Sequence, residues 1–360
     1  MPVQLVSAEE AIQAMSQADG YSCIIDARSE DEFALDRLPH AFNWPSLSNE
    51  ERIRVGTLYK QVGAFEANKL GASLVAANIA KHIQTHVMDL PKSWRPLVYC
   101  WRGGKRSGSL ALVLGQIGFK VSVIEGGYKA FRAAVVQQIS QLALGLHFKV
   151  IAGPTGSGKT RLLHALAEQG AQVLDLEALA VHRSSVLGRI PGKEQPSQKQ
   201  FDTRIWDALR QMDTHRVVYV EAESKKVGNV SVPDALIETI RASECIHIDL
   251  QLDERVALLL EDYAFFAQDA ELFCNRLQTL VPTLGKALIE EWQSMVNTGH
   301  TAQVVEDLLI KHYDPTYARS VARNFVCWPQ AQHLGVKDRH AVTLKVLATQ
   351  LIASENHMPA

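Results

Sequence analysis

A single cysteine, Cys100, follows the apolar stretch RPLVY and begins a loop rich in glycine and positive charge. A thiolate rather than a thiol is the nucleophile, and nearby cations or a helix N-terminus lower its pKa. Two glycines allow the loop to turn backbone N–H groups toward an anion. We therefore predict that Cys100 is a catalytic nucleophile. The predicted supporting residues of its oxyanion-binding loop are Arg102, Gly103, Gly104, Lys105 and Arg106.

The spacing from Cys100 to Arg106 and Ser107 also matches the Cys-x5-Arg-Ser loop of cysteine-based phosphatases. Those enzymes usually carry histidine just before the cysteine, where this chain has Tyr99. They also need a general acid from another loop. The spacing thus predicts a site for a tetrahedral oxyanion, and it leaves open whether the thiolate attacks phosphorus, sulfur or selenium.

The second chemical motif is GPTGSGKT, a complete phosphate-binding loop that lies between an apolar strand pattern and a helix pattern. Its glycines direct backbone N–H groups inward, and the following helix adds partial positive charge. Lys159 supplies a full charge for a terminal phosphate. The motif predicts phosphate binding without specifying ATP, hydrolysis or transfer. The predicted phosphate-binding residues are Gly153, Gly156, Ser157, Gly158, Lys159 and Thr160.

A metal ion beside the phosphate would need a hydroxyl and a carboxylate. The Thr160 hydroxyl suits Mg²⁺, and Glu221, Glu223 and Asp175 each follow a predicted strand. Strand-end carboxylates also serve as helix caps or remain solvated. We therefore name Thr160 and Glu221 as possible Mg²⁺ ligands and expect no tightly bound cofactor.

Strand and helix patterns alternate around both motifs, which indicates parallel βαβ units. A helix pattern follows the last strand of the first region, and we predict one domain over residues 1–138 and a second over 145–360. From about residue 253 the pattern becomes mostly helical. The strand candidates are YSCIIDAR, RPLVYC and KVSVIEGG in the first domain, and HFKVIAG, AQVLDLE, RVVYVEAES and CIHIDLQL in the second.

Composition limits the class of protein. The chain has 360 residues, is 47% hydrophobic and 21% charged, and carries a formal net charge of −2. This balance indicates a globular protein without a global basic field. Five scattered cysteines argue against a disulfide framework. Without a signal-peptide pattern or a long apolar run, we expect a cytoplasmic protein with no membrane association.

The first domain resembles a rhodanese module. The resemblance rests on Asp26-Ala-Arg28, on EFALDRLPHAFNWP, on the Cys100 loop and on IEGGYKAFR. Followed by a P-loop domain, it resembles the bacterial tRNA 2-selenouridine synthases. Ser184 stands where that family would have glycine. Other segments that carry the resemblance are ERIRVGTLYKQVG, LDLEALAVHRSS, FDTRIWDAL, VYVEAESKKVG and HYDPTYARS.

The resemblance implies an α/β fold, with an N-terminal rhodanese-like parallel-sheet domain and a P-loop NTPase-like domain that has a helical C-terminal part. It implies a transferase that acts on the wobble 2-thiouridine of tRNA. Geranyl diphosphate would alkylate the sulfur, and selenophosphate would then supply selenium to give 2-selenouridine. An enzyme that supplies selenophosphate is an expected partner.

Three alternatives remain at this point. The chain could be a rhodanese-type sulfurtransferase with a nucleotide-binding regulatory domain, a kinase or ATPase with a rhodanese interaction module, or a dual phosphatase-kinase. No spacing of basic residues marks a tRNA-binding surface. The candidates for phosphate contacts are Arg183, Arg189, Lys193, Lys199, Arg204, Lys225, Lys226, Arg319 and Arg323.

Overall fold

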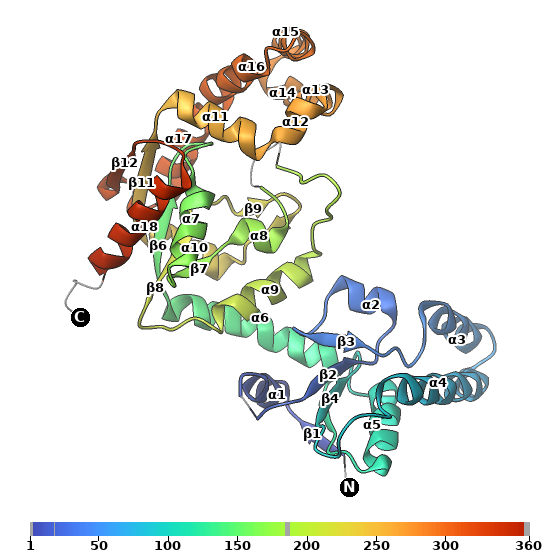
Figure 1. The fold of residues 1–360 in the computed structure, drawn as a ribbon. Coiled ribbons are helices and arrows are strands. Elements are labelled where there is room, and N and C mark those ends of the chain that lie inside the picture. Colours follow the sequence, from blue (N-terminus) through green and yellow to red (C-terminus); the bar gives the residue numbers. More distant parts are fainter. Residues whose placement is uncertain (1–2, 18, 184–187, 356–360) are drawn as a thin grey trace. The chain divides into compact units, whose positions relative to one another are not determined.

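The computed structural model describes residues 3–17, 19–183 and 188–355, so Ser184 lies outside the described residues. The chain divides into two compact units (Figure 1). The first contains residues 1–139 and 196–207, and the second contains residues 140–195 and 208–360.

The first unit is built on a five-stranded parallel sheet in the order β1-β5-β4-β2-β3. Parallel strands need crossover connections, which here are helices. The central strand β4 is buried along its whole length, which explains its continuous apolar sequence PLVY. The strands are β1 (Gln4–Val6), β2 (Cys23–Asp26), β3 (Ala41–Asn43), β4 (Pro96–Tyr99) and β5 (Ser122–Ile124).

Local capping chemistry sets the start of three helices of this unit. Ser7, Ser29 and Ser48 each form a capping box with a glutamate three residues later. The helices are α1 (Ala8–Met15), α2 (Glu30–Leu35), α3 (Asn49–Gln61), α4 (Ala64–His86), α5 (Lys105–Ile117) and α6 (Gly127–Gly145), the last of which continues into the second unit.

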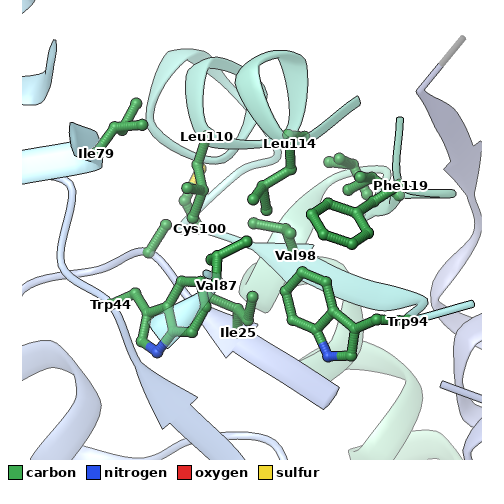
Figure 2. Packing of buried hydrophobic residues seen from close by; sticks show 14 residues of the cluster. Ile25, Trp44, Ile79, Val87, Trp94, Val98, Cys100, Leu110, Leu114 and Phe119 are labelled. Carbon is green, nitrogen blue, oxygen red and sulfur yellow. The ribbon is translucent and has the colours of Figure 1, made fainter. Parts of the chain in front are cut away.

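The core of the first unit extends to the reactive cysteine. Trp94 packs edge-on against Phe119 with ring centroids 5.1 Å apart, and Trp44 stacks on Trp94 at 6.1 Å. Cys100 belongs to the same buried cluster and is 3% exposed (Figure 2). The backbone that carries the thiol is therefore fixed by core packing.

A helix from the middle of the chain completes the first unit. Helix α9 (Gln198–Leu209) packs against α6, where the Trp206 ring meets Phe131 edge-on at 5.4 Å. The Trp206 indole N–H donates to the Gln138 side chain at 2.8 Å. The predicted second domain contained this segment, whereas its contacts place residues 196–207 in the first unit. An amphipathic helix pattern does not reveal which core covers its apolar face.

The second unit is also built on a five-stranded parallel sheet, in the order β12-β11-β6-β8-β7. Strand β12 (Gln332–Val336) lies within the region whose sequence pattern is mostly helical. It pairs with β11 from Ile246 opposite Gln332 to Leu250 opposite Val336. The other strands are β6 (His147–Ala152), β7 (Gln172–Leu174), β8 (Val217–Glu221) and β11 (Glu244–Leu250), and a separate hairpin joins β9 (Lys226–Val227) to β10 (Val230–Ser231).

Helices make up most of the second unit beyond β11, as the sequence predicts. Among the described helices of the chain, none combines the length and hydropathy that a membrane span needs. The α-helices are α7 (Lys159–Glu168), α8 (Leu176–Ala180), α10 (Asp234–Ala242), α11 (Leu252–Asp262), α12 (Ala264–Gln268), α13 (Ala270–Leu277), α14 (Val281–Leu284), α15 (Lys286–Asn297), α16 (Thr301–Leu308), α17 (Asp314–Asn324) and α18 (Ala341–Glu355). Shorter helical turns are η1 (Gln278–Leu280), η2 (Leu309–Tyr313) and η3 (Trp328–Gln330).

Candidate functional site

The Cys100 loop lies between the end of β4 and the start of α5. The Ser107 hydroxyl, in the first turn of α5, donates to the Cys100 Sγ at 3.1 Å. An open cup of about 360 Å³ lies over the loop. The residues that line the cup are Cys100, Trp101, Arg102, Gly104, Lys105 and Arg106. The structure thus brings the predicted residues together around the thiol, with Gly103 in the same loop.

The start of α6 holds the loop in place. Backbone N–H groups of Tyr128 and Lys129 donate to the Cys100 and Trp101 carbonyls at 2.8 and 3.1 Å. Gly127 has φ +58°, and a Cβ there would come within 2.3 Å of the Cys100 carbonyl oxygen. Gly103 has φ +66°, and a Cβ there would lie 2.7 Å from the Ile124 carbonyl oxygen. Only glycine permits this close approach of the two segments.

Hydrogen-bond donors make Cys100 more acidic than an ordinary cysteine. Burial alone would raise its pKa, but the Ser107 hydroxyl and the backbone N–H groups of Ser107, Gly104 and Arg102 lower the pKa below its usual value. A larger thiolate fraction follows, as a nucleophile requires. The structure therefore supports the predicted reactivity through dipoles that point at the sulfur.

The basic residues of the loop have other partners or face solvent. Arg106 forms an ion pair with Glu32 at 2.7 Å. The Lys105 ammonium donates to the Asn68 side chain at 3.3 Å, and Arg102 is exposed. The sequence predicts that these cations and the N-terminus of the following helix both lower the pKa of Cys100. In the structure the groups that lower it are the Ser107 hydroxyl and backbone N–H groups of the loop and of the start of α5, which agrees with the helix part of the prediction and not with the part on cations. A bound anion at the rim of the cup would meet Arg102 directly, whereas Lys105 and Arg106 would have to exchange their present partners for it.

The sequence does not reveal what two residues, Ser107 and Lys199, do at this loop. Ser107 was noted for its spacing, without a role as hydrogen-bond donor to the thiol. Lys199, from α9, lies with its ammonium 5.9 Å from the Trp101 ring centroid, although it is about a hundred residues away in sequence. Only the packing of α9 on the first unit could reveal this second contact.

The Asp26 and Arg28 pair, which supported the rhodanese resemblance, is structural. The two side chains are 0% and 1% exposed and form an ion pair at 2.6 Å. The Arg28 guanidinium also lies 4.0 Å from the Tyr128 ring centroid and donates to the Asp36 carbonyl at 2.6 Å. This pair ties the end of β2 to the residues that support the Cys100 loop.

The phosphate loop joins β6 to α7, as its motif predicts. Gly156 and Gly158 have φ +80° and +87°. A Cβ at Gly153 would lie 2.5 Å from the Ser157 hydroxyl oxygen, which is buried and has no hydrogen-bond partner. A buried hydroxyl without a partner is costly, so a phosphate oxygen would satisfy it on binding. The loop is shaped for an anion.

The groups of this loop that would bind phosphate form hydrogen bonds to other groups of the protein in this structure. The Lys159 ammonium donates to the carbonyls of Gly153 and Pro154 at 2.8 and 3.2 Å. The Gly153 N–H donates to the Tyr317 hydroxyl at 2.6 Å. Burial raises the pKa of Tyr317 well above its usual value, so the phenol stays neutral. A bound phosphate must exchange these internal bonds for its own.

A cavity of about 430 Å³ lies over the loop. The Arg183 guanidinium is at its edge, 4.3 Å from the Tyr263 ring centroid, and donates to the Asp262 carbonyl at 2.7 Å. Cationic and aromatic groups thus face the phosphate loop together. The residues that line this cavity include Thr155, Gly156, Gly158, Lys159, Thr160, Glu177, Arg183, Glu221, Glu223, Asp262, Tyr263, His312, Tyr313 and Tyr317.

Glu221 is the carboxylate best placed for a metal. Burial is the main cause that raises its pKa to about 8, Glu177 adds to the rise, and Lys159 and a hydrogen bond from Thr160 oppose it. Its Oε1 is buried without a hydrogen-bond partner. A hydroxyl beside a bare carboxylate oxygen fits Mg²⁺. Among the described residues, no group of three or more His, Cys, Asp or Glu side chains forms a metal site on its own.

Asp175 has a different role. Its side chain accepts the Ala178 N–H at 2.8 Å as the N-cap of α8 and also pairs with His164 at 3.0 Å. Glu223 is buried and lines the cavity. The candidate carboxylates thus divide into a helix cap, Asp175, and two that face the phosphate loop.

Remote residues that sequence reasoning did not single out fix the phosphate loop. The Arg255 guanidinium donates twice to the Thr155 carbonyl, at 2.9 and 2.8 Å, and pairs with Asp314 at 2.6 Å. Asp314 and Tyr317 both lie in the segment HYDPTYARS, quoted above only for its resemblance. The sequence signal that could have pointed to these residues is this segment, which places Asp314 and Tyr317 three residues apart on one helix.

Comparison with known proteins agrees with this architecture. The family model described as a rhodanese-like domain matches residues 7–134, and the one described as a tRNA 2-selenouridine synthase AAA domain matches residues 146–275. These matches and the two parallel sheets confirm the predicted fold class. Curated relatives match over most of the chain.

The tRNA 2-selenouridine synthase of Nitrosomonas europaea is 36% identical over 269 residues, which cover 74% of this chain and 69% of that protein. The one from Shewanella halifaxensis is 32% identical over 323 residues and covers 82% of this chain and 87% of its own. The one from Shewanella piezotolerans is 31% identical over 349 residues, with 88% and 93% covered. With both domains matched in the same order, this chain belongs to the tRNA 2-selenouridine synthase family.

Proposed function

We propose that this enzyme converts the wobble 2-thiouridine of tRNA to 2-selenouridine in two stages, each served by one of the two loops. The phosphate loop binds geranyl diphosphate for alkylation of the sulfur. The Cys100 loop binds selenophosphate for the exchange of sulfur by selenium. The observation that carries the proposal is that one chain holds two different anion-binding loops. The Cys100 loop contains a thiol of lowered pKa, and the phosphate loop contains no thiol.

In the first stage, the thiocarbonyl sulfur attacks C1 of the geranyl group. The C1–O bond breaks, diphosphate leaves, and the uridine N3 releases its proton to solvent. Lys159 and the N-terminus of α7 neutralise charge on the departing diphosphate. The buried Ser157 hydroxyl supplies a further hydrogen bond.

Thr160 and Glu221 are the residues that would hold Mg²⁺ beside the diphosphate. The ion would supply further neutralisation of the leaving group. Glu221 has a carboxylate oxygen free for this purpose, and burial raises its pKa although Lys159 opposes the rise, so a bound cation would favour its ionised form.

In the second stage, the Cys100 thiolate attacks the phosphorus of selenophosphate, and the P–Se bond breaks. The released selenide attacks C2 of the alkylated uridine, and geranylthiolate leaves and takes up a proton. Water then hydrolyses the S–P bond to phosphate and restores the thiol. The backbone N–H groups around the sulfur suit the phosphoryl oxygens, as does the rim with Arg102 and Arg106.

We assign the tRNA contacts to basic side chains on each unit. Arg319 and Arg323 are exposed on α17 of the second unit. Lys199 lies beside Trp101 on the first unit. Phosphate contacts of this kind make binding steeply dependent on salt. A selenophosphate-supplying enzyme is a further partner in the proposal, because the donor must be made for the second stage.

The test uses the full chain, an anticodon stem–loop RNA with 2-thiouridine, and mass spectrometry of the nucleosides. Geranyl diphosphate alone should give S-geranyl-2-thiouridine, and later addition of selenophosphate should give 2-selenouridine. Selenation without geranyl diphosphate would contradict the two-stage order. Sulfur transfer from thiosulfate without any selenation would favour a sulfurtransferase with a nucleotide-binding regulatory domain.

A further inference from the structure

A second, smaller cavity of about 50 Å³ adjoins the phosphate loop within the second unit. We call it the apolar slot. Helices α11, α12, α13 and α16 and the turn η2 supply its walls. The described residues that line it carry no charge. The apolar residues that line it include Leu260, Phe266, Phe273, Val305, Leu308 and Leu309.

The slot shares part of its wall with the cavity over the phosphate loop. Thr155, Leu259, Tyr263 and Tyr313 line both cavities. Thr155 belongs to the phosphate loop itself, and Arg255 holds its carbonyl at 2.9 and 2.8 Å. The mouth of the slot is therefore fixed relative to the groups that bind phosphate.

The walls of the slot are packed from stacked aromatic rings and buried aliphatic side chains. Phe266 stacks on Phe273 with ring centroids 4.9 Å apart, and Tyr263 stacks on Phe266 at 5.8 Å with their planes 3° apart. Phe273, Leu308 and Leu309 are buried, with exposed fractions of 2%, 2% and 0%. Such a cavity recognises hydrocarbon rather than a nucleobase, whose polar edge would need hydrogen-bond partners there.

We infer that the apolar slot binds the terminal isoprene unit of a prenyl diphosphate whose diphosphate lies on the phosphate loop. This inference rests on the proposed function. A ligand that fills both cavities must be anionic at one end and apolar at the other. The shared residues Thr155, Leu259 and Tyr263 would then contact the segment between its two ends.

The volume of the slot sets a chain length. A cavity of about 50 Å³ has room for roughly four waters on a scale of about 10–15 Å³ each, which is close to one five-carbon unit. A five-carbon prenyl group has only the isoprene unit bonded to the diphosphate, so it offers no second unit for the slot. A ten-carbon chain would fill the slot, and a fifteen-carbon chain would exceed it. The slot therefore selects geranyl over dimethylallyl and farnesyl chains.

Calorimetric titration of the full chain with inorganic pyrophosphate and with dimethylallyl, geranyl and farnesyl diphosphates tests this inference. Geranyl diphosphate should bind at least about tenfold more tightly than pyrophosphate and dimethylallyl diphosphate, because only its chain buries a further apolar unit. Farnesyl diphosphate should bind more weakly than geranyl diphosphate.

Two variants locate the tail. Val305→Trp fills the slot from a half-buried position and should reduce geranyl diphosphate affinity to that of dimethylallyl diphosphate, with pyrophosphate affinity unchanged. Leu260→Ala enlarges the slot and should shift preference toward farnesyl diphosphate. Val342→Trp, at a 74% exposed position on α18, is the matched control and should change neither affinity.

The outcomes separate this inference from the function on which it rests. Tighter binding of geranyl diphosphate than of pyrophosphate, with no effect of either slot variant, would overturn the slot assignment and leave the proposed function intact. Equal affinity for all three chain lengths would overturn the chain-length selection. Failure of pyrophosphate and every prenyl diphosphate to bind would overturn both the slot assignment and the role of the phosphate loop.

Discussion

The Cys100 loop and the phosphate loop have the same strand–loop–helix arrangement and differ in the atoms to which their hydrogen-bond donors point. Each joins a buried parallel strand to a helix through a glycine-rich turn. In the first, the donors point at the chain's own sulfur, with Ser107 at 3.1 Å. In the second, Lys159 and the Gly153 N–H bond to other groups of the chain. One loop is arranged around a reactive atom, whereas the other must rearrange to accept a ligand.

The two loops also differ in what holds them. The neighbouring helix α6 fixes the Cys100 loop through Tyr128, 28 residues away. Arg255 and Tyr317 fix the phosphate loop from 100 and 164 residues away. Local support favours permanent geometry. Remote support, in contrast, couples the phosphate loop to the C-terminal helices, so its binding energy depends on packing far along the chain.

The largest expected effect separates the two loops. Cys100→Ser should abolish 2-selenouridine formation and leave alkylation intact, because the hydroxyl stays protonated at neutral pH and cannot attack the donor. Nucleoside mass spectrometry should show the S-geranyl nucleoside accumulating. Hydrogen selenide added directly should restore selenation in this variant, because the thiolate serves only to release selenium.

Cys23→Ser is the matched control, because burial raises the pKa of the Cys23 thiol to about 11 and no role is assigned to it. Normal selenation in Cys100→Ser would make Cys100 a bystander. Loss of alkylation as well, in a folded protein, would show that the division of labour between the loops is wrong.

Lys159→Ala tests the phosphate loop with the next largest effect. Loss of one charge-assisted phosphate contact should cost about 1.5–3 kcal/mol, or roughly ten- to a hundredfold in geranyl diphosphate affinity. Titration calorimetry measures it, with the exposed Lys286→Ala as control. Unchanged affinity would place the diphosphate elsewhere.

Ser107→Ala sharpens the comparison by asking what activates the thiol. Removal of the hydroxyl should raise the pKa of Cys100, so the pH profile of iodoacetamide alkylation should move to higher pH. Arg102→Gln, at an exposed position, should move it less. A larger shift for Arg102→Gln than for Ser107→Ala would restore the cations as the main cause.

Tyr317→Phe tests whether internal bonds compete with the ligand. Without the phenol oxygen the Gly153 N–H loses its partner in the free protein, so diphosphate should bind about two- to tenfold more tightly. Tyr219→Phe is the control. It too removes a buried hydroxyl, but one without a hydrogen-bond partner, and it should leave the affinity unchanged. Weaker binding by Tyr317→Phe would mean that its hydroxyl contacts the ligand.

Glu221→Gln should change the pH dependence of stability. The folded protein holds a proton on Glu221 up to about pH 8, whereas the unfolded chain releases it near 4.5. The contribution of Glu221 to stability is thus present below the unfolded value and lost as pH rises toward 8. Thermal melts should show the variant gaining on the wild type between pH 5 and pH 8. A difference independent of pH would contradict the raised pKa.

Much of the fold followed from local patterns. Apolar runs and glycine turns predicted the strands that carry both loops, because a buried parallel strand needs a continuous apolar sequence. Strand β12 was missed because its sequence, QHLGV, is short and mostly exposed, and only pairing with β11 makes it a strand. The placement of α9 was missed because helix periodicity shows a buried face without naming its partner.

The residues that could do chemistry can be identified from the sequence, because loop chemistry depends on neighbours in the chain. They are Cys100 with its glycine-rich loop and the motif from Gly153 to Thr160. The folded structure shows that the Ser107 hydroxyl and backbone N–H groups, rather than the loop cations, lower the pKa of the thiol. It alone brought Arg255 and Tyr317 to the phosphate loop. Hydrogen bonds and burial depend on distance in space, and only the folded chain sets that distance for residues far apart in sequence.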